Sequence, residues 1–281
     1  MNLSGKSVIV TGAGRGIGKV IAAKCASQGA TVILLGRTLS ELQEAQSEVE
    51  KLGGGSYVKV CDISDERSVE EAVSFALEKC NSLDVLVNNA GVQPPIGPFS
   101  ETGAAAWKKN IEINLFGAIH CTREVLPEML QRRKGKIINI SGGGSTSARP
   151  NFTAYAVSKT ALVRFTETLA IELKGLNIDV NAISPGAINT RMLDEVIQAG
   201  ELSGDELAAA SKRKLNGGDN PEAAADLVAF LASDASDGIT GKLISAKWDP
   251  WREKAFQERL RSEKDLATLR RIDDSTYGSI K

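Results

Sequence analysis

Two residues with chemically useful side chains, Tyr155 and Lys159, stand four positions apart. On a helix this spacing places both side chains on one face. A cation beside a phenol favours the phenolate, so the pair predicts a tyrosine whose pKa falls towards the working range of a general acid/base. The same spacing also occurs on ordinary solvated helix faces, so the interpretation depends on the rest of the chain.

A glycine-rich run at residues 11–18 follows a short apolar stretch and precedes a helical pattern. Glycines permit a tight turn that brings backbone N–H groups close to a pyrophosphate, and the start of the next helix favours the anion. The run therefore predicts a dinucleotide site. Its predicted cofactor contacts are Gly12, Gly14, Arg15, Gly16, Ile17 and Gly18.

The end of the second apolar run bears on the choice of cofactor. An NAD site carries an acidic residue there for the ribose 2′-hydroxyl, whereas this chain has Gly36, Arg37 and Thr38. Arginine suits the 2′-phosphate of NADP because its planar fork donates two hydrogen bonds, and Arg15 could approach the same phosphate. We therefore expect NADP(H) in preference to NAD(H). The alternative is that both arginines are ordinary surface residues.

The composition carries no signature of nucleic-acid or membrane binding. The 281 residues have a net charge of −1 and are 42% hydrophobic, which gives no electrostatic reason for either kind of partner. No apolar run reaches membrane-spanning length, and residues 1–6 show no secretory signal. Four scattered cysteines predict reduced thiols in a cytoplasmic protein. The single histidine, His120, excludes a histidine-rich metal site, and we expect no metal.

Short apolar runs alternate with helical patterns along the chain. Continuous apolar runs suit strands that are covered on both faces, and their alternation with helices predicts a doubly wound α/β fold. We expect a single Rossmann domain over residues 1–245, with a parallel sheet of about seven strands. The predicted strands are 7–11, 31–35, 56–60, 83–88, 136–141, 177–183 and 241–245, and the clearest helices are 16–28, 39–52 and 64–80.

Residues 246–281 read as a helical C-terminal extension. Asp249 is the predicted N-cap, Pro250 the first helical residue, and the helix runs on through Leu260. Such a helix packs on the domain surface, closes over a site as a lid, or contacts another subunit.

Five motifs in order resemble the short-chain dehydrogenase/reductase family over residues 4–243. They are the glycine run, Asn-Asn-Ala-Gly at 88–91, Asn114, the Tyr155–Lys159 pair, and Pro-Gly-x-x-x-Thr at 185–190. The resemblance implies that Tyr155 exchanges a proton with the substrate oxygen, that Lys159 lowers its pKa and holds the nicotinamide ribose, and that Asn114 holds a relay water. Homodimers or homotetramers are common in the family.

The resemblance also implies further cofactor contacts. Asp62 would contact the adenine, and Ile188 and Thr190 the nicotinamide carboxamide. The remaining implied contacts are Ile63, Asn88, Ala90, Gly91, Pro185 and Gly186.

The chain departs from the family pattern in two places. Thirteen residues before Tyr155, where the family has a serine that donates to the substrate carbonyl, stands Gly142. Ser141 is our candidate for the catalytic hydroxyl, because the glycines that follow it permit a loop rearrangement. Ser145 is a second candidate, and the third possibility is that water or Tyr155 alone polarises the carbonyl. The usual Val-Asp-Gly-Gly ending is also replaced, which leaves subunit packing and the pocket rim unpredicted.

Residues 191–221 are expected to form the substrate loop. Their basic run, Lys212-Arg213-Lys214, is either a solvated helix face or, together with Arg191 or Arg149, part of a pocket for an anionic substrate. The leading functional hypothesis is an NADP-dependent oxidoreductase that transfers a hydride between the nicotinamide and a small-molecule carbonyl or alcohol. The alternatives are an NADP-binding sensor or structural subunit with weakened catalysis, which Gly142 motivates, and a sugar epimerase or dehydratase.

Overall fold

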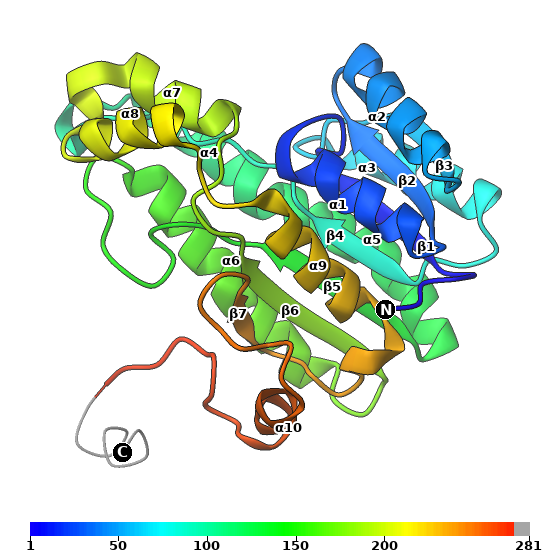
Figure 1. Ribbon diagram of the computed structural model, residues 1–281. Helices are drawn as coiled ribbons and strands as arrows, with labels where there is room; N and C mark the ends of the chain where they lie inside the picture. Colours follow the sequence, from blue (N-terminus) through cyan, green and yellow to red (C-terminus); the bar gives the residue numbers. More distant parts are fainter. Residues whose placement is uncertain (273–281) are drawn as a thin grey trace.

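The computed structural model describes residues 1–272 and is built on one parallel sheet. Its seven strands lie in the order β3-β2-β1-β4-β5-β6-β7, which is the doubly wound arrangement that the sequence predicted (Figure 1). The strands are β1 (Ser7–Thr11), β2 (Thr31–Gly36), β3 (Gly55–Val60), β4 (Val85–Asn88), β5 (Gly135–Ile140), β6 (Ile178–Ser184) and β7 (Leu243–Ser245).

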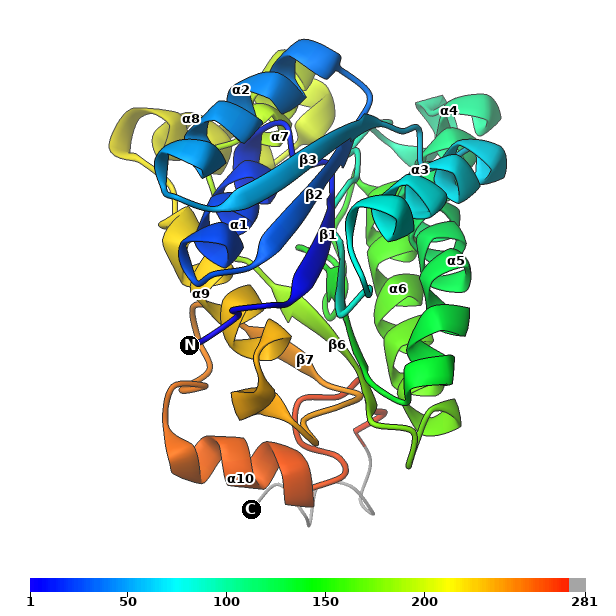
Figure 2. The ribbon, with the colours of Figure 1, turned by 90° about the vertical axis from the view of Figure 1, so that its right-hand side faces the viewer.

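Helices connect the strands and cover both faces of the sheet (Figure 2). The α-helices are α1 (Gly16–Ser27), α2 (Leu39–Lys51), α3 (Glu66–Lys79), α4 (Ala104–Ile111), α5 (Gly117–Arg132), α6 (Thr153–Glu172), α7 (Arg191–Ala199), α8 (Glu206–Asn216), α9 (Pro221–Ala232) and α10 (Lys254–Ser262). Short 3₁₀ turns lie at Phe99–Glu101, Gly200–Ser203 and Asp234–Ser236, and a π-helical turn, η2, at Glu112–Phe116. Within residues 1–272, no helix is both long and apolar enough to cross a membrane.

The inner strands of the sheet are buried on both faces because each face has its own helical layer. In β1, Val8 and Val10 pack into the core beneath α1, α2 and α9, whereas Ile9 packs into the core beneath α3, α5 and α6. Period-two alternation of side chains therefore sends neighbouring residues into separate hydrophobic cores. This is why a continuous apolar run, rather than an alternating one, identified the strands.

The C-terminal extension begins its helix later than predicted. The Asp249 carboxylate does not cap a helix; it accepts a hydrogen bond from the Ser245 backbone N–H at 2.7 Å, and α10 starts only at Lys254. Between them, Trp251 is 2% exposed and packs on the Phe230 ring, with 5.7 Å between ring centroids. The predicted helix start is wrong because burial of Trp251 fixes the chain before the helix begins.

The described part of the extension also covers the last strand. Lys242 Nζ donates to the carbonyl oxygens of Glu263, Lys264 and Leu266 at 2.7–3.1 Å, and Leu243 N–H donates to the Ala267 carbonyl at 2.7 Å. In both ribbon views α10 lies at the end of the molecule away from α7 and α8 (Figures 1 and 2). Residues 273–281 of the predicted extension lie outside the described residues.

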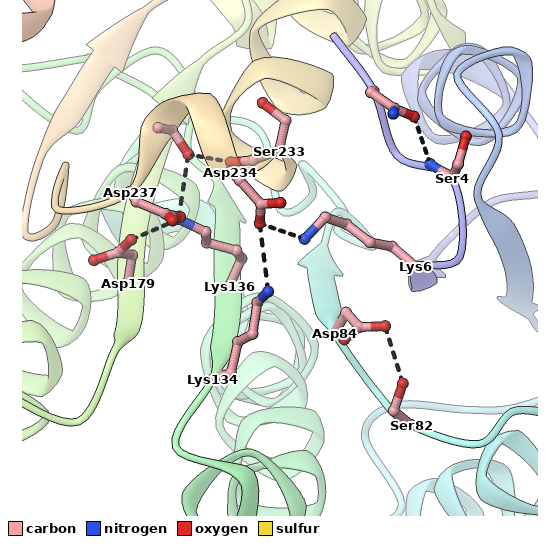
Figure 3. Close-up of polar contacts among 12 residues, drawn as sticks. Ser4, Lys6, Ser82, Asp84, Lys134, Lys136, Asp179, Ser233, Asp234 and Asp237 are labelled. Atoms are coloured by element: carbon pink, nitrogen blue, oxygen red, sulfur yellow. Dashed lines mark hydrogen bonds and ion pairs between the residues drawn. The ribbon is translucent and has the colours of Figure 1, made fainter.

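A buried lysine joins three elements at the amino-terminal edge of the sheet. Lys136 Nζ, on β5, lies 2.6 Å from both Asp179 Oδ2 on β6 and Asp237 Oδ1 after α9 (Figure 3). Its side chain is 7% exposed, whereas Lys134 nearby is 52% exposed and lies 3.6 Å from Asp234 Oδ1. Two lysines near the start of β5 therefore form ion pairs of different burial: that of Lys136 is buried, and that of Lys134 is exposed to solvent.

We expect Lys136→Met to lower the free energy of unfolding by about 3–5 kcal/mol, because it leaves the buried Asp179 carboxylate without its cation. Lys134→Met is the matched control and should change stability by about 0–1 kcal/mol, because its partner is solvated. Urea unfolding of both variants measures the difference. Equal losses would contradict the assignment of Lys136 as a buried structural ion pair.

Candidate active site

A cleft of about 860 Å³ runs along the carboxyl edge of the sheet. Its lining includes residues that follow each of the first six strands, namely Gly12, Arg37, Asp62, Ala90, Ser141 and Pro185. In an open parallel sheet, ligands bind at this edge where the strand order reverses, here between β1 and β4. The sheet therefore brings together motifs that are dispersed along the sequence.

The glycine run forms a turn that other residues could not adopt. Gly12 (φ +64°) and Gly16 (φ +54°) occupy the left-handed region, and a Cβ on Gly18 would lie 2.3 Å from the Gly12 carbonyl oxygen. Asn89 Nδ2 also donates to the carbonyl oxygens of Thr11 and Gly12 at 2.8 and 3.3 Å. The turn is thus fixed directly before the N-terminus of α1, in the geometry suited to a pyrophosphate.

The part of the cleft beside the ends of β2 and β3, where the sequence predicts the adenosine, carries Arg15, Arg37, Thr38, Asp62 and Ile63. Burial raises the pKa of Asp62. Hydrogen bonds from the backbone N–H and the hydroxyl of Ser64, together with the charge of Arg37, outweigh burial, so the pKa of Asp62 lies below its usual value. Arg15 Nη1 lies 3.0 Å from a carboxylate oxygen of Glu41 at the start of α2. Asp62 is therefore a charged acceptor, and the positive charge of Arg37 acts on it.

Tyr155 and Lys159 line the same cleft from one face of α6 and are 6% and 3% exposed. Lys159 Nζ donates to the Ile140 carbonyl at 2.8 Å and lies 5.8 Å from the centroid of the Tyr155 ring. Burial lowers the pKa of Lys159 to about 8. Burial also raises the pKa of Tyr155, whereas the charge of Arg149 lowers it and that of Glu206 raises it. In this arrangement the expected depression of the tyrosine pKa is absent, because desolvation of the phenolate dominates.

Asn114 lies behind the cleft, on the π-helical turn η2. Its Oδ1 accepts from Val92 N–H at 2.8 Å, and its Nδ2 lies within hydrogen-bonding distance of Val92 O, Asn110 Oδ1 and Ser158 Oγ. A Cβ on Gly91 would lie 3.0 Å from Asn114 Oδ1. Asn114 thus holds the segment after β4 against α6. Its part in a water relay stays a prediction.

The structure corrects the assignment of Asn88. This side chain does not line the cleft; its Nδ2 donates to Asn139 Oδ1 at 2.9 Å and to Thr122 Oγ1 at 3.2 Å, inside the layer of α5. Strand alternation sends Asn88 and Asn89 to opposite sides. The residue that clamps the glycine turn is Asn89, which the motif contained and the sequence did not single out.

Gly142 and the two serines proposed to supply the missing hydroxyl lie in different surroundings. A Cβ on Gly142 would lie 2.3 Å from Tyr155 Oη, so the phenol oxygen occupies the space that a side chain there would need. Ser141 lines the cleft, but its hydroxyl is buried without a hydrogen-bond partner within residues 1–272, and its N–H is held by the Ile183 carbonyl. Ser145 does not line the cleft. Within residues 1–272, neither serine donates a hydrogen bond to the Tyr155 hydroxyl, and the catalytic role of Ser141 stays a prediction.

The substrate end is bounded by α7, α8 and the loop before α6. Phe152, Leu193 and Val196 form an apolar cluster with Tyr155, and the polar residues Gln93, Arg149 and Glu206 line the cleft beside it. Of the basic run on α8, Arg213 and Lys214 reach the rim, where Lys214 Nζ pairs with Asp194 at 2.6 Å. No residue of the C-terminal extension up to residue 272 lines the cleft. Its role as a lid or as a subunit contact stays a prediction.

The fold and the cleft place this chain in a known class: it belongs to the short-chain dehydrogenase/reductase family. The family model for short chain dehydrogenases matches residues 6–200. Members are NAD(P)-dependent oxidoreductases acting on CH–OH and C=O groups, and the chain is an enzyme of this kind.

Individual relatives cover nearly the whole described domain. The chain is 35% identical to the 3-oxoacyl-[acyl-carrier-protein] reductase FabG of Thermotoga maritima, over 87% of this chain and 97% of the relative. It is 34% identical to the 7alpha-hydroxysteroid dehydrogenase of Escherichia coli K12, over 87% and 94%. The crystal structure of NAD⁺-bound xylitol dehydrogenase superposes with a TM-score of 0.81 at 28% identity, covering 87% of this chain and 98% of that one.

We expect Gly142→Ala to lower turnover by about 10- to 100-fold, because the new methyl group displaces the Tyr155 hydroxyl, and a displacement of about 1 Å at a reacting group is costly. Gly143→Ala is the matched control, since a Cβ there meets no atom within 4 Å. Steady-state kinetics and NADPH binding of both variants test this. Wild-type turnover by the Gly142 variant would show that the phenol oxygen is not confined there.

Proposed function

We propose that the chain is an NADP(H)-dependent oxidoreductase that interconverts a small-molecule carbonyl and alcohol, with Tyr155 as the general acid/base. The observation that carries this proposal is the burial of Tyr155 and Lys159 in the same cleft as the glycine turn. An ionisable phenol and a buried lysine beside a dinucleotide site form the arrangement that proton transfer alongside hydride transfer requires.

Bound cofactor would supply or accept the hydride. The glycine turn and the start of α1 would hold its pyrophosphate, and Ile188 and Thr190 would hold its carboxamide. Tyr155 donates its hydroxyl proton to the carbonyl oxygen during reduction and removes the hydroxyl proton during oxidation. Lys159, with a pKa of about 8, carries a proton in the neutral range that can be delivered towards Tyr155. Leu193 and Val196 on α7 pack with Tyr155 and give this part of the cleft an apolar wall.

The preference for NADP(H) rests on the chain's own residues, since the similar xylitol dehydrogenase structure contains NAD⁺. Arg37 and Thr38 follow β2 directly, and Arg15 stands at the same end of the cleft. Neither Gly36 nor Arg37 repels a 2′-phosphate. Two acidic residues, Glu41 and Asp62, line this end of the cleft and would repel a 2′-phosphate. The Glu41 carboxylate is paired with Arg15.

A second candidate, a cofactor-binding sensor with weakened catalysis, is favoured by Gly142 and by the unpartnered Ser141 hydroxyl. Oxidation of NADPH over a panel of ketones and aldehydes separates it from the enzyme. Tight NADPH binding without turnover on any of them would favour the sensor. Assembly as a homodimer or homotetramer and a cytoplasmic location stay predictions.

Tyr155→Phe should reduce turnover by at least about 100-fold, because it removes the proton that the substrate oxygen needs. NADPH affinity should remain nearly unchanged. Tyr57→Phe, a change of the partly exposed tyrosine on β3, is the control and should behave as wild type. Retained turnover by the Tyr155 variant would refute the acid/base assignment.

Arg37→Gln should weaken NADPH binding by about 10- to 100-fold and leave NADH binding unchanged, because a charge-assisted hydrogen bond is worth roughly 1.5–3 kcal/mol. Arg67→Gln, a change of an arginine that is exposed on α3 and outside the cleft, is the control. Isothermal titration with both cofactors gives the comparison. Equal weakening of NADH and NADPH would contradict recognition of the 2′-phosphate.

A further inference from the structure

An arginine stands beside Tyr155 where the sequence offered no hydroxyl. Arg149 lies on the loop between β5 and α6, and its side chain is 14% exposed. The guanidinium carbon lies 3.9 Å from the centroid of the Phe152 ring and 5.3 Å from that of the Tyr155 ring. A stacked, desolvated guanidinium interacts more strongly with its neighbours than one in water.

Two partners from other elements fix the position of Arg149. Glu206, at the start of α8, accepts from Nε and Nη2 at 2.5 Å each. With its amide oriented to satisfy its neighbours, Gln93 accepts from Nη1 and Nη2 at 3.0 Å and donates to the Met192 carbonyl at 2.8 Å. The bidentate pair with Glu206 fixes the plane of the Arg149 guanidinium as well as its position.

The charged groups around Tyr155 come from three elements. Lys159 lies one turn along α6 and directs its ammonium to the Ile140 carbonyl. Arg149 stands on the preceding loop, and Glu206 approaches from α8. Glu195 and Asp194 on α7 line the same cleft, where Asp194 is paired with Lys214. Arg149 and Glu206 thus place opposite charges near the phenol from separately anchored segments.

Building on the acid/base role proposed for Tyr155, we propose that Arg149 is a positioning residue that favours the phenolate of Tyr155. Glu206, on the substrate-side helix α8, sets the strength of this effect by partly neutralising Arg149. The packing of α8 and the proton affinity of Tyr155 are therefore coupled through one ion pair.

The two charges act on Tyr155 with opposite signs. A positive charge stabilises the phenolate and lowers the pKa of Tyr155, and a negative charge raises it. Removal of Arg149 should therefore move the titration midpoint to higher pH, and removal of the Glu206 charge should move it to lower pH. If the Arg149–Glu206 pair were purely structural, removing either partner would shift the titration midpoint of Tyr155 in the same direction.

The test is a titration of the phenolate absorbance of the full chain saturated with NADP⁺, taken as the difference from Tyr155→Phe. We expect Arg149→Met to raise the midpoint by about one pH unit and Glu206→Gln to lower it, each retaining cooperative thermal unfolding. Arg149→Lys, which keeps the charge but not the fork, should lie closer to wild type than Arg149→Met. Glu206→Gln preserves shape and most contacts, so it remains informative where Arg149→Met folds poorly.

Asp194→Asn breaks the ion pair that joins α7 and α8, which does not involve Arg149 or Glu206, and should leave the midpoint unchanged. Shifts of one sign in both principal variants, equal midpoints for the Lys and Met variants, or a shift in Asp194→Asn as large as that in Glu206→Gln would each overturn the proposal. Unmoved midpoints alongside loss of turnover in Tyr155→Phe would refute only the role of Arg149. Retained turnover in Tyr155→Phe would refute the proposed function itself.

Discussion

The burial of one lysine amine at the carboxyl edge of the sheet constrains the rest of the cleft. Lys159 is 3% exposed, and its Nζ donates to the Ile140 carbonyl at the end of β5. Desolvation opposes the charged amine, which is why its pKa falls to about 8. The neighbouring chain must then leave room: a Cβ on Gly91 would lie 3.4 Å from Nζ and 3.0 Å from Asn114 Oδ1. The ends of β4 and β5, the turn η2 and α6 are thereby locked together.

The sequence was sufficient wherever one local rule governed the structure. The predicted strands lie within about two residues of the observed ones. Continuous apolar runs mark β1, β2 and β4, which are buried on both faces, whereas the edge strand β3 is partly exposed. The rule failed at Asn88, where two adjacent asparagines are equivalent in the motif and only the strand pleat decides which faces the glycine turn. A residue's face at the end of a strand depends on where the strand ends, and composition does not encode that point.

In the C-terminal extension, tertiary packing overrides the local helix-start signal of Asp249 and Pro250. An Asp-Pro pair is a sound helix start, but an N-cap contributes only about 1 kcal/mol. Burying a tryptophan of roughly 150–250 Å² at about 25 cal/mol per Å² contributes up to about 4–6 kcal/mol. Trp251 therefore packs against Phe230 first, and the helix begins where the constraint ends, at Lys254. Lys242 Nζ donates to backbone carbonyls of the segment after α10, and this segment covers the edge of β7.

The cofactor end and the substrate end of the cleft differ in how they are encoded. The glycine turn, Arg37 and Asp62 each follow a strand directly, so their place is set by the sheet. Arg149 is set by Glu206, which lies 57 residues further along the chain, and no spacing in the sequence links them. Gly142 stands where family members have a serine beside the tyrosine. In this chain the Arg149–Glu206 ion pair, whose members are far apart in the sequence, lies near Tyr155. With the role proposed for Arg149, changes to α8 reach the proton chemistry of Tyr155 through the Arg149–Glu206 ion pair.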